Sequence, residues 1–340
     1  VGIGEALTAS SIKKQAEIKF IETTGQGSLT GEIRDGTGVN PDSGIEDPND
    51  DTIPSAYYYE NKAKTTLAGT LTINTKGHGI TLDGNSSTIV TTPNSSGYYE
   101  ITVPEGDEKN YYALNVLSGT INLGLAEWSN SYKNTKILGT AKINGDVYIG
   151  ADGDVHIGLM KGDSVLNGTV VNEGGAIDLQ IAHDAEWHNV SNNKNNKNGT
   201  SYINNLGIGR RQSSLTDNFK EYTVGAGEIH QSADSGDIVV GTLASVYKQQ
   251  STNWGYTDGA DARIYYTIDE ENPAVVKGGN VVINSAAAGS EITLCANWNP
   301  AITKDNLWRV FNGLANKLYY LGYIYKTDDK GNLVDAEGNI

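Results

Sequence analysis

The feature that most constrains the fold is a recurring short segment, about four residues long, that ends at glycine, asparagine or aspartate. Aliphatic residues occupy alternate positions in each segment, which places them on one face of a β-strand. Glycine and asparagine tolerate positive φ and therefore suit the turns between such strands. Segments of this kind lie at 70–74, 79–83, 141–144, 146–149, 154–157, 164–166, 168–172, 237–240 and 280–284. The pattern predicts an all-β chain of many short strands.

Three longer stretches, 119–128, 175–187 and 290–298, are variants of one pattern. Each runs from a small residue through Ile, a polar residue and Leu to an alanine-containing link and a tryptophan. The Ile and Leu side chains are expected on the inner face of a strand, and the tryptophan just past the strand, covering a corner of the core. The irregular spacing of the three stretches indicates a loose repeat with insertions.

Strands this short suit either a sandwich or barrel, or a solenoid. We favour the solenoid, a right-handed parallel β-helix, because no Asn-Gly hairpin signal separates long alternating runs. Asparagine also recurs directly after strands, where side-chain amides of successive turns can form a ladder. These residues are Asn74, Asn144, Asn172 and Asn284. At about 20–25 residues per turn, the chain would form roughly ten to twelve turns, each rising about 4.8 Å.

The expected organisation follows from where this pattern holds and where it breaks. Residues 1–35 are a junction or the first turns, 36–56 a polar loop, and 57–302 the β-helix with a polar insertion at 189–200. The two polar segments are expected to emerge from the β-helix without burying enough apolar surface to order themselves. Residues 323–340 are expected to be a strand and turn leading to the next unit.

Residues 303–322 predict an amphipathic helix, docked on the β-helix or joining two units. Thr303 or Asp305 is expected to cap its start and Gly322 to close its end. The apolar stripe consists of Leu307, Phe311, Leu314, Leu318 and Leu321.

Charge, hydrophobicity and cysteine content argue against several classes of partner and against a disulfide. The net charge is −16 with a pI near 4.7, and the sequence has no basic stripe. These features argue against binding to nucleic acid and against binding to anionic lipid. No run of 18 apolar residues occurs, so we expect no membrane insertion of this segment. The single cysteine, Cys295, excludes an intramolecular disulfide and is expected to be a buried apolar thiol beside Leu294 and Ala296.

Gly77-His78-Gly79 matches one motif of the pectin-hydrolysing β-helix enzymes. Those enzymes also need carboxylate pairs upstream and an Arg-x-Lys downstream. The upstream pair here, Asp50-Asp51, lies in a proline-containing loop, and no Arg-x-Lys follows. We interpret the motif as a turn and predict no catalytic residue.

Two acidic loops, 152–154 and 258–261, could bind a cation weakly, but neither matches a full calcium motif. The histidines His156, His183, His188 and His230 are scattered in the sequence and lack zinc-site spacing. We therefore predict neither a metal site nor a cofactor.

Paired tyrosines are the remaining candidates for a binding surface. They lie at 57–59, 98–99, 111–112, 265–266 and 319–320. One member of each pair should face the core and the other should face out, where it could stack on a sugar or anchor a protein. The candidates are Tyr58, Tyr98, Tyr112 and Tyr265; the alternative is ordinary β-sheet surface.

The tryptophan-ended stretches, the phrase 77–84 and the segment 305–320 together resemble passenger segments of autotransporter adhesins from Gram-negative bacteria. In such proteins a helix like that of 305–320 is followed by a strand and then by a phrase similar to 4–11, so the resemblance implies about one period of a tandem array. It implies an extracellular, surface-attached adhesin or display segment without catalysis. Its partners would be a host or bacterial surface glycan or protein, and neighbouring repeats of the same polypeptide. The alternatives are a polysaccharide-acting enzyme, a purely structural spacer and an unrelated β fold.

Overall fold

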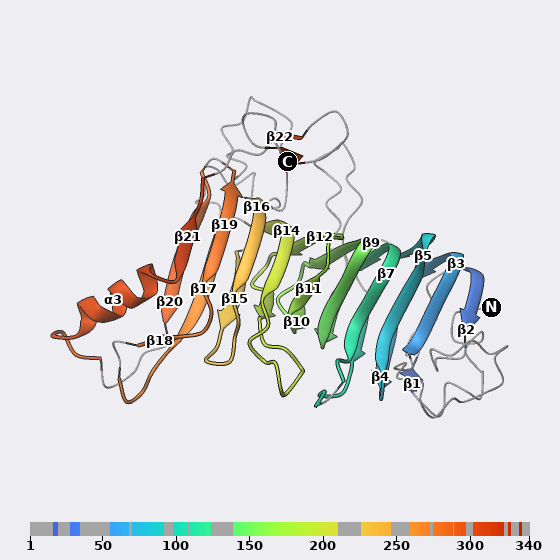
Figure 1. The fold of residues 1–340 in the computed structure, drawn as a ribbon, viewed down its shortest axis with the longest axis horizontal. Helices are drawn as coiled ribbons and strands as arrows, with labels where there is room; N and C mark the ends of the chain where they lie inside the picture. Colours follow the sequence, from blue (N-terminus) through green and yellow to red (C-terminus); the bar gives the residue numbers. More distant parts are fainter. Residues whose placement is uncertain are drawn as a thin grey trace, which may run out of the picture.

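The protein is mostly β-structure, arranged as two large sheets that face each other across one core (Figure 1). The computed structural model describes residues 16–19, 28–34, 55–67, 70–91, 98–107, 109–123, 139–209, 226–245, 259–272, 275–287, 289–296, 302–322, 326–327 and 333–334. Residues 36–54 of the expected polar loop lie outside these residues, whereas its last two, Ser55 and Ala56, belong to a strand. Two of the three repeat tryptophans, Trp128 and Trp298, also lie outside.

The first sheet has ten strands. In spatial order they are β1 (Ala16–Lys19), β4 (Thr70–Thr75), β6 (Tyr98–Thr102), β8 (Thr140–Asn144), β10 (Val165–Asn167), β13 (Glu186–His188), β15 (Gly227–Gln231) and β17 (Asp261–Ile268), with β18 (Val276–Lys277) and β20 (Glu291–Ala296) both paired to β17.

The second sheet has eleven strands. In spatial order they are β2 (Ser28–Arg34), β3 (Ser55–Leu67), β5 (His78–Thr91), β7 (Tyr112–Leu123), β9 (Asp146–Leu159), β12 (Ala176–Ile181), β14 (Ser201–Ile208), β16 (Ile238–Ser245), β19 (Val281–Ala286) and β21 (Leu318–Tyr320), with β11 (Val170–Asn172) beside β9. A separate antiparallel pair joins β22 (Lys326–Thr327) to β23 (Leu333–Val334).

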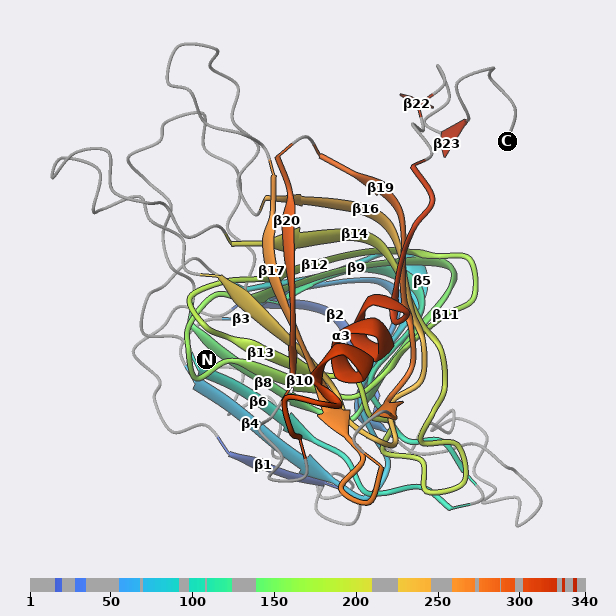
Figure 2. The same cartoon turned by 90° about the vertical axis from the view of Figure 1, so that its left-hand side faces the viewer.

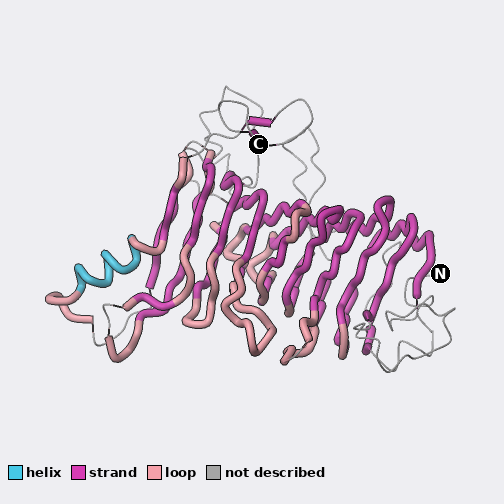
Figure 3. Tube along the Cα trace, in the orientation of Figure 1, coloured by secondary structure: helices cyan, strands magenta, loops and turns pink. Residues whose placement is uncertain are grey.

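From β3 to β20 the chain passes back and forth between the two sheets, except at β11–β12 and β17–β18, where two consecutive strands share a sheet (Figures 1 and 3). Most neighbours within a sheet run parallel. Each strand therefore pairs with one from a preceding pass of the chain. The antiparallel pairs among the described strands are β1–β4, β2–β3, β17–β18 and β22–β23. Parallel pairing on this scale excludes, for the described strands, a sandwich whose sequence neighbours pair as hairpins.

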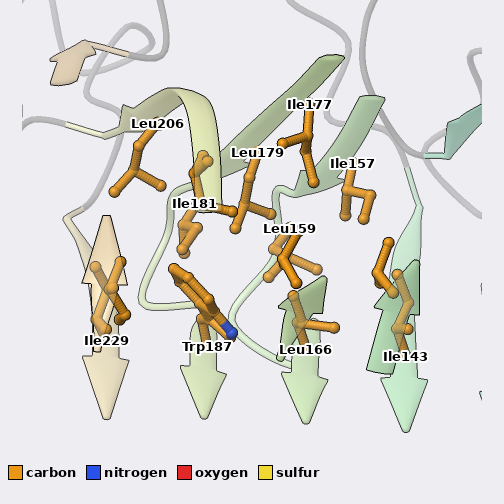
Figure 4. Packing of buried hydrophobic residues seen from close by; sticks show 14 of the residues in the cluster. Ile143, Ile157, Leu159, Leu166, Ile177, Leu179, Ile181, Trp187, Leu206 and Ile229 are labelled. Carbon is orange, nitrogen blue, oxygen red and sulfur yellow. The ribbon is translucent and has the colours of Figure 1, made fainter. Parts of the chain in front are cut away.

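One continuous aliphatic core lies between the sheets (Figure 4). The alternation predicted from the sequence is confirmed in β12, where Ile177, Leu179 and Ile181 are buried. Each core position has a counterpart in the next parallel strand, as Leu179 has in Leu206. Because side chains alternate between the two faces of a strand, burying one residue in the core places the side chains of its two sequence neighbours on the outer face.

Trp187 lies inside this core, at the centre of β13 (Figure 4). Its side chain is fully buried, and its indole Nε1–H donates to the Gly168 carbonyl at 2.9 Å. The prediction that this tryptophan lies past a strand at a corner is wrong. The three residues Glu186–His188 pair with strands on both sides, and this pairing draws Trp187 into the ten-stranded sheet.

Asparagine side chains form the predicted contacts between successive strands. Asn167 Nδ2 donates to Asn144 Oδ1 at 2.7 Å, and Asn172 Nδ2 donates to Asn204 Oδ1 at 3.0 Å. The two ladders lie on different sheets, and each satisfies side-chain amides that face away from the core.

Residues 189–200 are held by polar contacts, so the prediction that this segment does not order itself is wrong. Asn192 Nδ2 donates to the carbonyls of Pro104 and Tyr111, each at 2.9 Å. Its Oδ1 accepts the Asp146 N–H at 2.9 Å, and the Asp146 carboxylate accepts the hydroxyl of Ser191. These hydrogen bonds to part-buried and buried groups replace the apolar burial that the segment lacks.

The helix α3 (Leu307–Ala315) covers one end of the core (Figure 2). Its inward side chains are Val310 and Leu314, whereas Phe311 is 61% exposed. The helix is shorter than predicted because Leu318 begins β21, which pairs with β19. Its N-terminal capping position is Asn306, which makes no side-chain cap hydrogen bond, so neither Thr303 nor Asp305 caps the helix.

The structure also bears on two other expectations, a buried Cys295 thiol and the lack of a membrane-spanning segment. Cys295 is half-exposed, because Leu294 points toward the core and the alternation turns the thiol outward; the prediction of a buried thiol is wrong. Within the described part of the chain, no helix has the length and hydrophobicity needed to cross a bilayer.

Replacing Trp187 with alanine should destabilise the fold by about 3–5 kcal/mol, because it leaves a large cavity and an unpaired Gly168 carbonyl. Urea denaturation followed by circular dichroism measures the loss. Trp308→Ala is the matched control, since Trp308 is 62% exposed and its removal should change the free energy of unfolding by less than about 0.5 kcal/mol. Equal effects of the two substitutions would contradict the placement of Trp187.

Asn192→Ala should release residues 189–200, because two carbonyls and one backbone N–H lose their partner. We expect faster proteolysis within 189–200 and a loss of about 1–3 kcal/mol of stability. Asn196→Ala, at an exposed position of the same segment, should change neither. Indistinguishable cleavage rates for the two variants would rule out the anchoring role.

Candidate functional site

Three aromatic rings stack on the outer face of the ten-stranded sheet. His188, His230 and Tyr265 occupy equivalent positions of β13, β15 and β17. The His188 and His230 ring centroids are 4.4 Å apart with planes 16° apart, and those of His230 and Tyr265 are 4.9 Å and 9° apart. The spacing matches that of neighbouring strands, about 4.8 Å, so the register alone brings the rings into contact.

A second, charged column runs beside the rings, two residues earlier on each strand. It consists of Glu186, Glu228 and Arg263. The residues between the two columns, such as Trp187 and Ile229, point into the core. The strands therefore present Glu-x-His, Glu-x-His and Arg-x-Tyr to the same face, and we call these six outward residues the ring-stack face.

Short contacts connect the two columns. His188 Nε2 lies 2.7 Å from Glu186 Oε2, and His230 Nε2 lies 3.4 Å from Glu228 Oε2. Glu228 Oε1 also accepts the Tyr265 hydroxyl at 3.4 Å. Arg263 Nη1 approaches the same oxygen at 3.7 Å and partly balances its charge.

Burial lowers the pKa of His230, and the neighbouring His188 lowers it further, while the carboxylates of Glu186 and Glu228 oppose the shift. His230 Nε2 is sealed from solvent and has no hydrogen-bond partner of good geometry, although the Glu228 carboxylate lies within ion-pair distance. Burial raises the pKa of Tyr265, and the charge of Glu228 adds to this effect.

Glu186, His188 and His230 form a possible cation site, because one ligand atom of each lies within 4.8 Å of the others. Sequence spacing did not predict this group, because His188 and His230 are far apart in the chain. The signal that could have found it is the repeat of Glu-x-His at 186–188 and 228–230, provided that the two strands are known to be neighbours.

The other predicted tyrosines do not join this group. Tyr98 is half-exposed on β6, and its hydroxyl donates to Glu100 Oε2 at 2.8 Å. Lys142 Nζ lies 5.6 Å from the centre of the Tyr98 ring. Burial, together with the hydrogen bond to Glu100, raises the pKa of Tyr98 to about 12. Tyr58 belongs to β3, and its side chain lies outside the described part of the structure.

Tyr112 sits in a separate stack near the start of β7. Its ring lies 5.3 Å from that of His78, with planes 7° apart, and 5.2 Å from that of Tyr148. Tyr112 and Tyr265 therefore belong to different sheets and different stacks.

The predicted division between core and surface holds for two of the four tyrosine pairs whose side chains are described. Tyr99 and Tyr266 are buried, and their partners Tyr98 and Tyr265 face out. Tyr111 and Tyr112 are both half-buried, with Tyr111 packed against the core. In β21 both Tyr319 and Tyr320 are exposed, at 49% and 62%. This strand is the last of its sheet and lies where α3, rather than a facing strand, covers the core.

His78 of the Gly-His-Gly motif is buried at the start of β5. Its Nδ1 accepts the Tyr112 backbone N–H at 3.0 Å, which requires a neutral ring, and burial lowers its pKa to about 4. A Cβ at Gly79 would lie 2.4 Å from the Ala113 carbonyl oxygen, so only glycine fits there. These contacts give the motif a structural role; Asp50 and Asp51 lie outside the described residues.

His156 lies on the outer face of β9, between two carboxylates. Its Nε2 lies 3.1 Å from Asp154 Oδ1, and its Nδ1 lies 3.9 Å from Asp178 Oδ2. Hydrogen bonding to Asp154 and then to Asp178 raises the pKa of His156 to about 9, against the effect of burial. Of the acidic loops considered in the sequence, 152–154 therefore uses Asp154 to hold a cationic histidine, and Asp258 of the other lies outside the described residues.

No family model, curated protein or solved structure matches the chain. The fold and the arrangement of its side chains are therefore the basis for a functional assignment.

His156 and His78 should titrate on opposite sides of the usual histidine pKa. The protonated form of His156 is favoured by the fold, so its contribution to stability is complete below about pH 6.5 and is lost as the pH rises to about 9. His78 is held neutral, so its contribution is complete above about pH 6.5 and is lost as the pH falls to about 4.

Proton NMR of the two imidazoles across pH 3–10 measures both midpoints. Asp154→Asn should lower the midpoint of His156 and leave that of His78 unchanged. Midpoints near 6.5 for both histidines in the folded protein would contradict the described contacts.

Proposed function

We propose that this chain is a non-catalytic, extracellular segment of a bacterial cell-surface adhesin or display protein, built as a right-handed parallel β-helix. The observation that carries the proposal is the repeated passage of the chain between two mostly parallel sheets around one aliphatic core. Such a chain can extend by adding similar turns, and it keeps long outer faces free for side chains in register. An extended body of this kind suits attachment, or the projection of a binding region away from a cell.

The ring-stack face is the proposed binding surface. Because its rings cover one another's faces, the groups presented outward are ring edges, carboxylates and one guanidinium. These groups form directional hydrogen bonds, which suits the hydroxyls of a surface glycan or the polar groups of a protein. Tyr98 is a second candidate for contact with a sugar, because it is half-exposed and stands apart from the stack, with Lys142 over its ring.

Neighbouring repeats of the same polypeptide are the second proposed partner. Apolar side chains gather on α3 and β21, at the end of the strand array (Figure 2). Trp308, Phe311 and Tyr320 are each more than 60% exposed. A following unit that covers this end would remove a patch that a soluble surface rarely leaves open.

The proposal is tested by small-angle scattering for shape, followed by a glycan array and a binding assay on host cells with the isolated chain. We expect a rod-like particle and saturable binding that Tyr265→Ala weakens at least about tenfold. Tyr202→Ala is the control, because Tyr202 is 48% exposed on the other sheet.

Three results would oppose the proposal. A compact, non-elongated particle would argue against the β-helix. Binding to no glycan and no cell would favour a structural spacer, and release of new reducing ends from a polysaccharide would favour an enzyme.

A further inference from the structure

We propose that Glu186, His188 and His230 bind one divalent transition-metal ion, with Zn²⁺ as the best-matched ion. The proposal concerns a site on the outer face of β13 and β15 and does not depend on whether the chain is an adhesin. Its basis is the three potential ligand atoms within 4.8 Å of one another, held on two paired strands.

The donor set suits zinc. Two imidazole nitrogens and one carboxylate oxygen form a three-ligand set that zinc accepts in tetrahedral sites, with a fourth position open to water or another ligand. Calcium and magnesium prefer all-oxygen sites, so the paired imidazoles select against them.

The backbone places the ligands without help from loops. Glu186 and His188 are two residues apart on β13 and share its outer face, and His230 is the register partner of His188 on β15. Core residues on the inner face of both strands, Trp187 and Ile229, fix their orientation. A site on paired strands is held more rigidly than one on a loop.

Small side-chain rotations complete the site. In a tetrahedral zinc site the ligand atoms lie about 3.3 Å apart, as follows from metal–ligand distances near 2.0–2.1 Å. Glu186 Oε2 and His188 Nε2 already lie 2.7 Å apart, so the larger movement must be made by His230, toward these two atoms. The two imidazoles, now stacked, must tilt so that both nitrogen lone pairs converge. All three residues are half-buried.

The surroundings favour a cation. Among the described residues, His230 Nε2 contacts Glu228 Oε2 at 3.4 Å without a hydrogen bond of good geometry, so metal binding at this nitrogen would replace only a weak contact. Glu228, 3.4 Å from that nitrogen, adds negative charge and is itself held by Arg263 and Tyr265.

His156 supplies a matched control. It also lies on an outer face beside two carboxylates, Asp154 and Asp178, but its register partners on the neighbouring strands are Asn122 and Asp178, neither of which carries an imidazole. If exposed histidine–carboxylate pairs alone explained zinc binding, the two places would bind alike.

The test is isothermal titration of the intact chain, initially free of metal, with zinc chloride at pH 7.5. We expect one saturable site. His188→Gln and His230→Gln should each weaken the affinity at least about tenfold, and His156→Gln should leave it unchanged. Circular dichroism checks that each variant folds. No saturable binding by the wild type, or equal loss in the His156 variant, would overturn the proposal.

A second measurement needs no variant. Cobalt titrated into the wild-type chain should give the intense visible absorption of a four-coordinate ion and should shift the proton NMR signals of His188 and His230 ahead of that of His156. Weak octahedral absorption only, or a first response at His156, would equally overturn the proposal. Because neither experiment involves a glycan or a cell, its outcome is independent of the adhesion test.

Discussion

The rest of the structure depends on the parallel register between strands that are distant in sequence. Because neighbouring strands lie about 4.8 Å apart, two equivalent residues are always in contact, whatever the length of chain between them. Inside, this rule joins Leu179 to Leu206 and builds the core. Outside, it produces the asparagine ladders and the stack of His188, His230 and Tyr265. Core packing and surface chemistry are therefore two results of one geometric constraint.

The residues that follow local rules were predictable from the sequence. The alternation in β12 indicates which side chains face the core, and asparagines after strands indicate contacts between turns. The register between strands is not a local property of the sequence. Asn189 and Gln231, which directly follow the two histidines, are in contact although they are 42 residues apart in the chain. The ring-stack face therefore could not be assembled from the sequence, although each Glu-x-His segment is visible in it.

The errors have a common cause in tertiary contacts. The periodicity of 303–322 describes one long helix, but pairing with β19 pulls Leu318 into a strand, and the core selects Val310 rather than Phe311. Composition alone makes 189–200 a free polar loop. It is nevertheless held in place, because the Asn192 side chain donates to the backbone carbonyls of Pro104 and Tyr111.

The anchoring of residues 189–200 affects the order in which the strands should unfold. In a stack of strands, cooperativity normally passes only between nearest neighbours, so ends can fray one layer at a time. Residues 189–200 follow β13, yet they contact Asp146 at the start of β9 and the loop between β6 and β7, although β6 and β13 are not neighbours in their sheet. The segment thereby links layers that do not touch each other. The region from β6 to β13 should open as a single block, and a break that starts at either end would meet its main resistance there.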